Sequence, residues 1–213
     1  MAGTSAPTAD RRSVFVIDDD RSVCRALGRL LTSFGYPVET FQSAEQFLES
    51  GRLEDAGCLI VDLRLPGLDG RELQKRIATD APGVPVVFLS GQSDVPTSVQ
   101  AMKEGAIDFL TKPVEAQRLV EVVDEALNTG SRNRSNEAEL ASIRARVNLL
   151  TARERQVMHL VASGMLNKQI AYHLGTSEKT IKVHRSRVVE KLQVSSVAEL
   201  VRLVDRMSAS DGS

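Results

Sequence analysis

Residues 13–128 alternate, five times over, between short apolar runs and segments whose apolar residues recur at helical spacing. The apolar runs cover residues 13–17, 37–41, 58–62, 85–90 and 107–111. The first helical segment spaces Val23, Leu27, Leu30, Leu31 and Phe34 by three and four, and later ones cover roughly 43–50, 69–79, 96–104 and 115–127. Runs that are apolar at nearly every position are typical of strands covered on both faces. The alternation therefore predicts an α/β fold with a doubly wound parallel sheet.

Polar residues stand where four of these predicted strands end. Asp18 and Asp19 follow the first run, Asp62 ends the third, Ser90 ends the fourth, and Lys112 follows the fifth. Carboxyl ends of parallel strands meet at one edge of a sheet, so these side chains are expected to gather there. Crowded carboxylates need a cation, and Mg²⁺ prefers such hard oxygen ligands. One carboxylate could then attack phosphorus, while the hydroxyl and the ammonium group bind phosphoryl oxygens.

Each of these residues also has a commoner explanation. An acid after a strand usually caps the next helix, and a lysine is usually a solvated surface charge. Asp20 fits the common explanation: its charge suits a helix N-terminus, and we expect it to open the first helix without touching a metal. For the other residues, their joint placement at four strand ends favours a site.

Residues 14–128 resemble the receiver domains of two-component response regulators, and "LSGQSDVPTSVQAMKEGAIDFLTKP" is especially similar to the FixJ branch. The resemblance implies a flavodoxin-like five-stranded sheet with strand order 2-1-3-4-5. It also implies that Asp62 accepts a phosphoryl group from a sensor histidine kinase. By the same resemblance Asp19 and Asp62 bind Mg²⁺ directly, Asp18 acts through water, and the backbone carbonyl of Arg64 completes the set.

Three further roles follow from this resemblance. Ser90 would be the hydroxyl that moves on phosphorylation, and Lys112 would bind the phosphoryl group next to a cis peptide with Pro113. Phe109 matches the aromatic switch position, although a plain buried ring is also compatible with the sequence.

A change of composition follows the alternating region. The stretch "NTGSRNRSNE" (128–137) breaks the pattern with Gly, Ser, Asn and Arg, so we expect a domain boundary there. Beyond it, Leu140, Ile143, Val147 and Leu150 recur at heptad-like spacing. Two heptads are too few to establish a coiled coil, and we favour a helix that docks on its own domains over a dimer seam. The predicted domains are 13–128, a partly helical linker over 129–149, and 150–207.

Residues 151–207 have helical patterns throughout. We expect four helices, over about 152–163, 167–174, 178–192 and 196–206, with Gly164 and Gly175 as stop signals. Thr151 and Glu154 have the spacing of a capping box, and Asn167 is a candidate N-cap.

The third of these helices is basic. It carries Lys179, Lys182, Arg185, Arg187 and Lys191 against two glutamates. Over 151–205 there are 9 basic and 5 acidic residues, a net +4, whereas residues 14–128 have 11 and 19, a net −8. A basic helix is most often a solvated face, but two short helices joined through "LGTS" indicate a helix-turn-helix that enters the DNA major groove.

The stretch from Leu150 to Leu200 resembles the LuxR-type (NarL/FixJ) DNA-binding domain. The resemblance implies a four-helix domain with 178–192 as the recognition helix. Lys182 and Val183 match positions that face bases, whereas Lys179, Thr180 and Arg187 are candidates for phosphate contacts. The last helix, with Val197, Leu200, Val201 and Val204, serves either a dimer contact or the core.

We therefore expect a phosphorylation-controlled transcription factor rather than an enzyme, with activation favoured over repression. Its expected partners are a sensor histidine kinase, double-stranded promoter DNA and a second copy of the chain, with RNA polymerase as a further candidate. One rival is a Mg²⁺-dependent phosphatase or phosphotransferase, but such an enzyme would need a general acid two residues after Asp62, where Arg64 stands. Another rival is a signalling module that binds only proteins.

The remaining composition points to the cytoplasm. Residues 1–10 lack the apolar core of a signal peptide, and no apolar run approaches a membrane span. Cys24 and Cys58 stand in apolar surroundings without metal-ligand spacing, as expected for reduced core thiols. We expect no membrane partner.

Overall fold

The computed structural model describes residues 12–91, 102–103 and 105–210. The chain divides into two compact units, residues 1–134 and 135–213. Each unit is described by itself.

The N-terminal unit contains the predicted parallel sheet. Its strands are β1 (Ser13–Ile17), β2 (Val38–Phe41), β3 (Ala56–Asp62), β4 (Val86–Ser90) and β5 (Asp108–Thr111). They lie in the order β2-β1-β3-β4-β5, and every neighbouring pair is parallel. The predicted fold class and strand order are confirmed. Because every residue of β3 and β4 is buried, the two strands could be recognised as continuous apolar runs.

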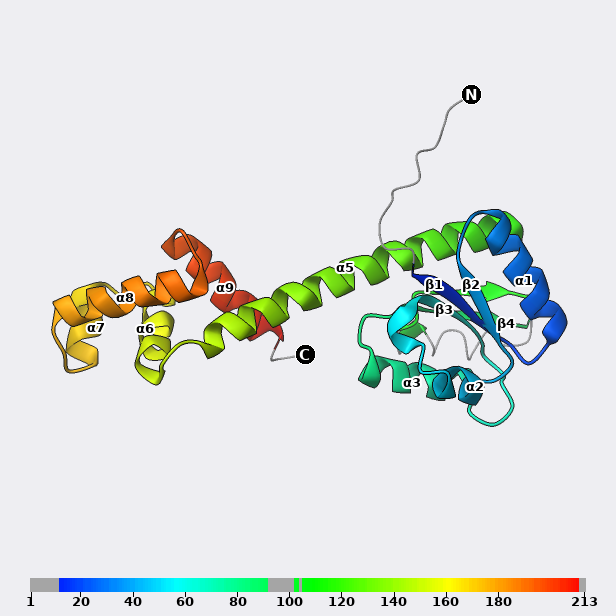
Figure 1. Ribbon diagram of the computed structural model, residues 1–213, viewed down its shortest axis with the longest axis horizontal. Helices are drawn as coiled ribbons and strands as arrows, with labels where there is room; N and C mark the ends of the chain where they lie inside the picture. The colour runs from blue at the N-terminus through cyan, green and yellow to red at the C-terminus, as the bar shows by residue number, and fades with distance from the viewer. Residues whose placement is uncertain (1–11, 92–101, 104, 211–213) are drawn as a thin grey trace, which may run out of the picture. The chain divides into compact units, whose positions relative to one another are not determined.

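Helices cover both faces of this sheet (Figure 1). They are α1 (Arg21–Ser33), α2 (Ala44–Glu49), α3 (Gly70–Asp80) and α5 (Ala116–Asn148), with a short 3₁₀ turn at Leu53–Asp55. The core between the sheet and α2 and α3 is centred on Phe15, Phe47 and Phe88, and the core on the other face joins α1 and the start of α5. The helix expected over 96–104 lies almost entirely outside the described residues.

Both cysteines belong to the second of these cores. Cys24 and Cys58 are free and buried, as expected. Burial raises the pKa of the Cys58 thiol to about 12, so the thiol stays protonated at neutral pH.

The expectation that the last receiver helix stops near residue 127 is wrong, because α5 continues to Asn148. Gly130, which belongs to the stretch expected to form the domain boundary, is a packing residue inside this helix. A Cβ on Gly130 would lie 2.9 Å from the carbonyl oxygen of Gly57 and 2.9 Å from Cδ of Pro85. The next turn of the helix also contacts this unit, since the Asn133 side chain donates a hydrogen bond to the carbonyl of Gly83. The glycine therefore lets α5 approach the backbone of β3 closely.

The C-terminal unit contains four further helices, α6 (Ala152–Ala162), α7 (Asn167–His173), α8 (Glu178–Leu192) and α9 (Val197–Ser210). These agree with the four predicted helices. Their core includes Ile143 and Val147 from the end of α5, together with Leu150. Three of the four heptad-like residues are thus buried within their own unit, which favours the docked helix over the dimer seam.

Of the two helix starts predicted from capping residues, one is confirmed and one is wrong. Thr151 and Glu154 form the predicted capping box, in which the Thr151 side chain accepts from Glu154 N at 3.2 Å and Glu154 accepts from Thr151 N at 2.9 Å. Asn167 is not an N-cap: it is the first residue of α7, and its side-chain oxygen accepts a hydrogen bond from Arg185 at 2.7 Å. A polar residue at this position therefore joins α7 to α8. No helix in the described ranges has the length and apolar character needed to cross a membrane.

Candidate functional site

The acidic side chains of β1 and β3 meet at one edge of the sheet. One carboxylate oxygen each from Asp18, Asp19 and Asp62 can be chosen so that all three lie within 4.8 Å of one another. Asp18 is fully buried, Asp62 is 9% exposed, and Asp19 is exposed. Asp20 has a different role, because its side chain caps α1 by accepting a hydrogen bond from Ser22 N at 2.7 Å. The acids predicted for the site are thus gathered, and the acid predicted for the helix begins it.

Lys112 reaches these acids from the end of β5. Its Nζ lies 2.6 Å from Oδ2 of Asp18 and also forms an ion pair with Asp62. Burial lowers the pKa of Lys112, but the hydrogen bonds to the two acids outweigh burial and hold the pKa above its usual value. Burial raises the pKa of Asp18, and Lys112 offsets this only in part, while the charge of Asp62 adds to it. The ammonium group is therefore charged and placed among carboxylates. The peptide between Lys112 and Pro113 is cis, as the resemblance implied.

The side chains present fit a hard divalent cation. Three carboxylates with closely spaced oxygens supply hard ligands, and Asp19 keeps the group open to water, as Mg²⁺ requires because it retains part of its hydration shell. The burial of Asp18 is costly for its charge, and a cation would relieve that cost.

The backbone that follows Asp62 is tightly placed. Leu63 N donates to the carbonyl of Leu89 at 2.9 Å, and Arg64 N donates to Oδ1 of Asp62 at 2.8 Å. Gly70 begins α3 directly behind the acid, since a Cβ there would lie 2.4 Å from the carbonyl oxygen of Asp62. The residue predicted to offer a carbonyl ligand, Arg64, therefore lies near the start of a loop whose two ends are fixed around the acid.

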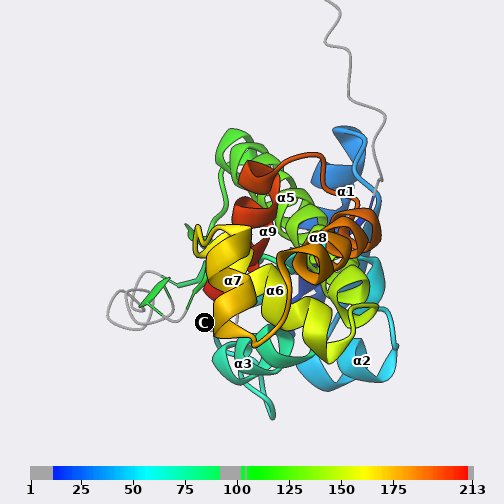
Figure 2. The ribbon, with the colours of Figure 1, turned by 90° about the vertical axis from the view of Figure 1, so that its left-hand side faces the viewer.

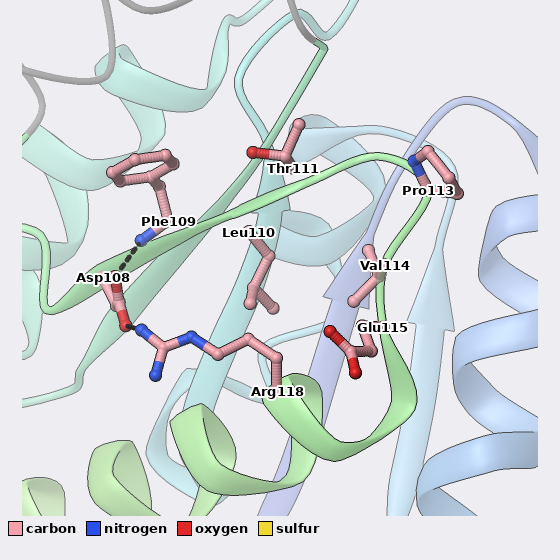
Figure 3. Close-up of a pocket in the computed structure, with 8 residues that line it drawn as sticks. All are labelled: Asp108, Phe109, Leu110, Thr111, Pro113, Val114, Glu115 and Arg118. Carbon is pink, nitrogen blue, oxygen red and sulfur yellow. Dashed lines mark hydrogen bonds and ion pairs between the residues drawn. The ribbon is translucent and has the colours of Figure 1, made fainter.

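Ser90 and Phe109 lie on the neighbouring strands β4 and β5. Ser90 is 3% exposed, one residue beyond the pair formed by Asp62 and Leu89, so it occupies the same sheet edge as the acids. The ring of Phe109 is 41% exposed, which rules out the plain buried ring. It borders an open pocket between β5 and the start of α5, where Arg118 pairs with Asp108 (Figure 3).

A second candidate surface lies on α8 in the C-terminal unit. Ile181, Val188 and Leu192 face the core, and the opposite side of the helix is exposed. That exposed side carries Lys179, Lys182, Val183, Ser186 and Arg187. Thr180 is half-buried, and its N–H and hydroxyl both contact Oγ of Ser177, the N-cap of α8. The predicted DNA contacts other than Thr180 therefore share one accessible face. α7 packs beside α8, as a helix-turn-helix requires (Figure 2).

Two basic residues of α8 have structural tasks instead. Nζ of Lys191 lies 2.7 Å from Oε2 of Glu154 and also donates to the carbonyl of Leu149 at 3.1 Å. Arg185 is bound to Asn167. Both side chains had been counted only as positive charge, and the ion pair of Glu154 with Lys191 was missed because nothing in the spacing of residues 154 and 191 relates them.

The apolar residues of α9 differ in burial, which bears on whether they serve the core or a dimer contact. Leu200 is 2% exposed and belongs to the core, whereas Val197 is 44% exposed. Val201 and Val204 are half-buried. The apolar stripe of α9 is therefore shared between the core and the surface.

Comparisons with known proteins agree with this division. Residues 14–124 match the response regulator receiver domain, and residues 148–204 match the luxR family of bacterial regulatory proteins. The response regulator protein TodT of Pseudomonas putida (strain F1) is 39% identical over 203 residues, which are 95% of this chain and 89% of TodT. The transcriptional regulatory protein FixJ of Bradyrhizobium diazoefficiens is 42% identical over 193 residues, 91% of this chain and 94% of FixJ.

Two solved structures are similar over both units. The response regulator StyR has a TM-score of 0.78 and 44% identity, covering 91% of this chain and 98% of StyR. Full-length FixJ from B. japonicum has a TM-score of 0.57 and 40% identity, covering 94% of this chain and 99% of FixJ.

Proposed function

The chain belongs to the response regulators that combine a receiver domain with a LuxR-type DNA-binding domain, a family of transcription regulators that interact with sensor kinases and DNA, and we propose from this that Asp62 is its phospho-acceptor. The observation that carries the proposal is the convergence of Asp18, Asp19, Asp62 and Lys112 at one sheet edge. We assign residues 13–128 to the receiver domain, 129–149 to the linker and 150–207 to the DNA-binding domain.

In the proposed reaction, a carboxylate oxygen of Asp62 forms a bond to phosphorus as the P–N bond of a phosphohistidine on the kinase breaks. The electron pair of that bond remains on the imidazole, which leaves. Bound Mg²⁺ would neutralise the charge that develops on the phosphoryl oxygens. We assign its ligands as Asp19 and Asp62 directly, Asp18 through water, and the carbonyl of Arg64. Lys112 exchanges one of its carboxylate partners for a phosphoryl oxygen, because its ammonium group is already at the site.

Ser90 and Phe109 would then change position in response to the new phosphoryl charge. Ser90 is the last residue of β4. This strand pairs with β3, which ends at Asp62. Phe109 lies on the following strand with an accessible ring. We propose that Ser90 moves toward the phosphoryl group, that Phe109 turns inward, and that the changed surface at β5 and α5 favours a homodimer.

The dimer would bind promoter DNA through α8. In this proposal Lys182 and Val183 face bases, and Lys179, Thr180 and Arg187 contact phosphates. The exposure of Lys179, Lys182, Val183 and Arg187 on one face supports their assignment, whereas Thr180 would contact phosphate while it stays hydrogen-bonded to the N-cap residue Ser177. The regulator would activate transcription, with RNA polymerase as a further partner, and would act in the cytoplasm where promoter DNA is found. We propose no turnover of its own on free substrates.

The phosphorylation proposal is tested by labelling. Incubation of the full chain with acetyl phosphate and Mg²⁺ should add one phosphoryl group, as seen by intact-mass spectrometry under mild conditions. Asp62→Asn should abolish the labelling, and the matched exposed acid variant Asp80→Asn should keep it. Stoichiometric labelling of Asp62→Asn would show that the phospho-acceptor is another residue.

A further inference from the structure

The loop that follows Asp62, residues 63–69, is fixed unevenly. Its first part is anchored by the buried side chains of Leu63 and Leu65. Its end is anchored by Asp69, which caps α3 by accepting a hydrogen bond from Glu72 N at 2.8 Å. The middle of the loop is at the surface, with Pro66 and Gly67 exposed. This middle segment needs a contact from outside the loop if the whole loop is to keep one conformation.

Glu45 of α2 makes that contact. Its Oε1 accepts a hydrogen bond from the backbone N–H of Leu68 at 2.8 Å. The same oxygen lies 2.5 Å from the position that a Cβ would take on Gly67, whose φ is +80°. A side chain at residue 67 would displace the carboxylate from this position, and the positive φ also favours glycine. Glu45 and the loop are therefore complementary in both hydrogen bonding and shape.

The carboxylate is suited to hold the loop at neutral pH. The hydrogen bond from Leu68 N–H lowers the pKa of Glu45 below its usual value, so the group is ionised. A hydrogen bond to an ionised acceptor is stronger than one between neutral groups. Glu45 comes from an element that contributes no ligand to the proposed Mg²⁺ site.

We propose that Glu45 is a positioning residue for cation binding, which holds the loop 63–69 so that the carbonyl of Arg64 stays in place beside Asp62. This inference rests on the proposed function, since Arg64 is the residue whose carbonyl completes the Mg²⁺ ligands there. The physical reason is that a hard cation with strict octahedral geometry tolerates little displacement of a backbone ligand. Residues that orient metal ligands from outside the ligand set commonly change affinity when they are replaced.

The test measures Mg²⁺ affinity directly, by isothermal titration calorimetry of the unphosphorylated full chain with MgCl₂. Glu45→Ala should weaken binding by about tenfold, the lower end of the range for such outer partners. Glu45→Gln keeps an oxygen that can accept from Leu68 N–H, so it should restore most of the affinity. Glu49→Ala removes an equal charge from an exposed position of the same helix and should bind as the wild type does.

Urea unfolding in EDTA separates positioning from plain stabilisation. If Glu45 only stabilised the fold, Glu45→Ala would lower the urea midpoint and leave the Mg²⁺ dissociation constant unchanged, which would overturn the inference. A Glu45→Gln variant as weak as Glu45→Ala would also overturn it, because the hydrogen bond would then not be the cause.

Different results would contradict the phosphorylation of Asp62 and the role of Glu45. If the wild type neither binds Mg²⁺ nor becomes labelled on Asp62, the proposed function fails and the role of Glu45 fails with it. If the wild type binds Mg²⁺ and is labelled while Glu45→Ala matches it in affinity, only the role of Glu45 is lost.

Discussion

Two buried acids, one in each unit, have nearly the same partners and opposite energetics. Asp18 has a lysine Nζ at 2.6 Å and accepts one backbone N–H, from Asp20. Glu154 has a lysine Nζ at 2.7 Å and accepts one backbone N–H, from Thr151. Yet burial raises the pKa of Asp18, whereas the hydrogen bond from Lys191 lowers the pKa of Glu154 to about 2.

Different causes dominate the two pKa values. For Asp18 the desolvation that comes with burial outweighs the hydrogen bonds, and the charge of Asp62, which shares Lys112, adds a smaller rise. Glu154 has its lysine without a second acid in that pair and lies at the beginning of α6, where the helix dipole favours a negative charge. The arrangement around Asp18 leaves negative charge that a ligand could neutralise. In the pair of Glu154 and Lys191, one positive charge balances one negative charge. Of these two lysine–carboxylate arrangements, the one with excess negative charge is therefore the one that fits a cation.

The largest expected change in stability is at Glu154, in the C-terminal unit. Replacement of Glu154 by Gln removes the charge paired with Lys191 and should lower the free energy of unfolding by about 1–3 kcal/mol. Urea denaturation followed by circular dichroism measures this, with Glu190→Gln on the exposed side of α8 as the control. Equal stability of the two variants would remove the distinction drawn between the two acids.

The stability difference between the wild type and Glu154→Gln should also depend on pH. The folded pKa of Glu154, about 2, is below its ordinary value of 4.5, so its contribution is present above pH 4.5 and is lost as the pH falls through 2. The stability difference between wild type and Glu154→Gln should therefore shrink across that window. A constant difference over the window would mean that the carboxylate charge is not its source.

Two lysines of α8 allow the comparison to be made within one helix. Lys182→Ala should weaken binding to a preferred duplex by about 1–3 kcal/mol and relax the sequence preference, while the urea midpoint stays unchanged. Lys191→Ala should instead lower the urea midpoint, because it leaves Glu154 without its partner. Fluorescence anisotropy and selection from randomised duplexes measure the first effect. An unchanged affinity and preference would remove Lys182 from the proposed DNA contacts.

The smallest effect has the opposite sign. In Mg²⁺-free buffer at neutral pH, Asp18→Asn should raise the free energy of unfolding by about 1 kcal/mol, because it removes a buried charge that its shared lysine compensates incompletely. Added Mg²⁺ should then stabilise the variant less than it stabilises the wild type. Destabilisation by Asp18→Asn in EDTA would show that its ion pair with Lys112 is as complete as that of Glu154.

The acidic site could be predicted because its residues carry a regular positional signal. Asp18, Asp62 and Ser90 each stand at the end of a recognisable strand, and the parallel sheet brings such ends together. Glu45 has no comparable signal, since its partner Leu68 lies in an irregular loop 23 residues away. Contacts between a short helix and a loop depend on tertiary packing, which periodicity does not describe.

Glycine and lysine were the residue types most open to misinterpretation. Gly130 belongs to the stretch expected to form a domain boundary, but its missing side chain serves the close approach of α5 to Gly57. Lys191 adds to the positive charge of its helix in the sequence, although it belongs to an ion pair. In both cases the residue type is compatible with two roles, and only the neighbouring backbone or side chain decides between them.

Charge added to Asp62 is proposed to change the oligomeric state of the whole chain. Light scattering of the full chain with Mg²⁺, before and after acetyl phosphate, measures this most directly. The account predicts a monomer that becomes a dimer on phosphorylation, while Asp62→Asn remains monomeric under both conditions. A fully labelled wild type that stays monomeric, or an Asp62→Asn variant that dimerises equally on addition of acetyl phosphate, would contradict it.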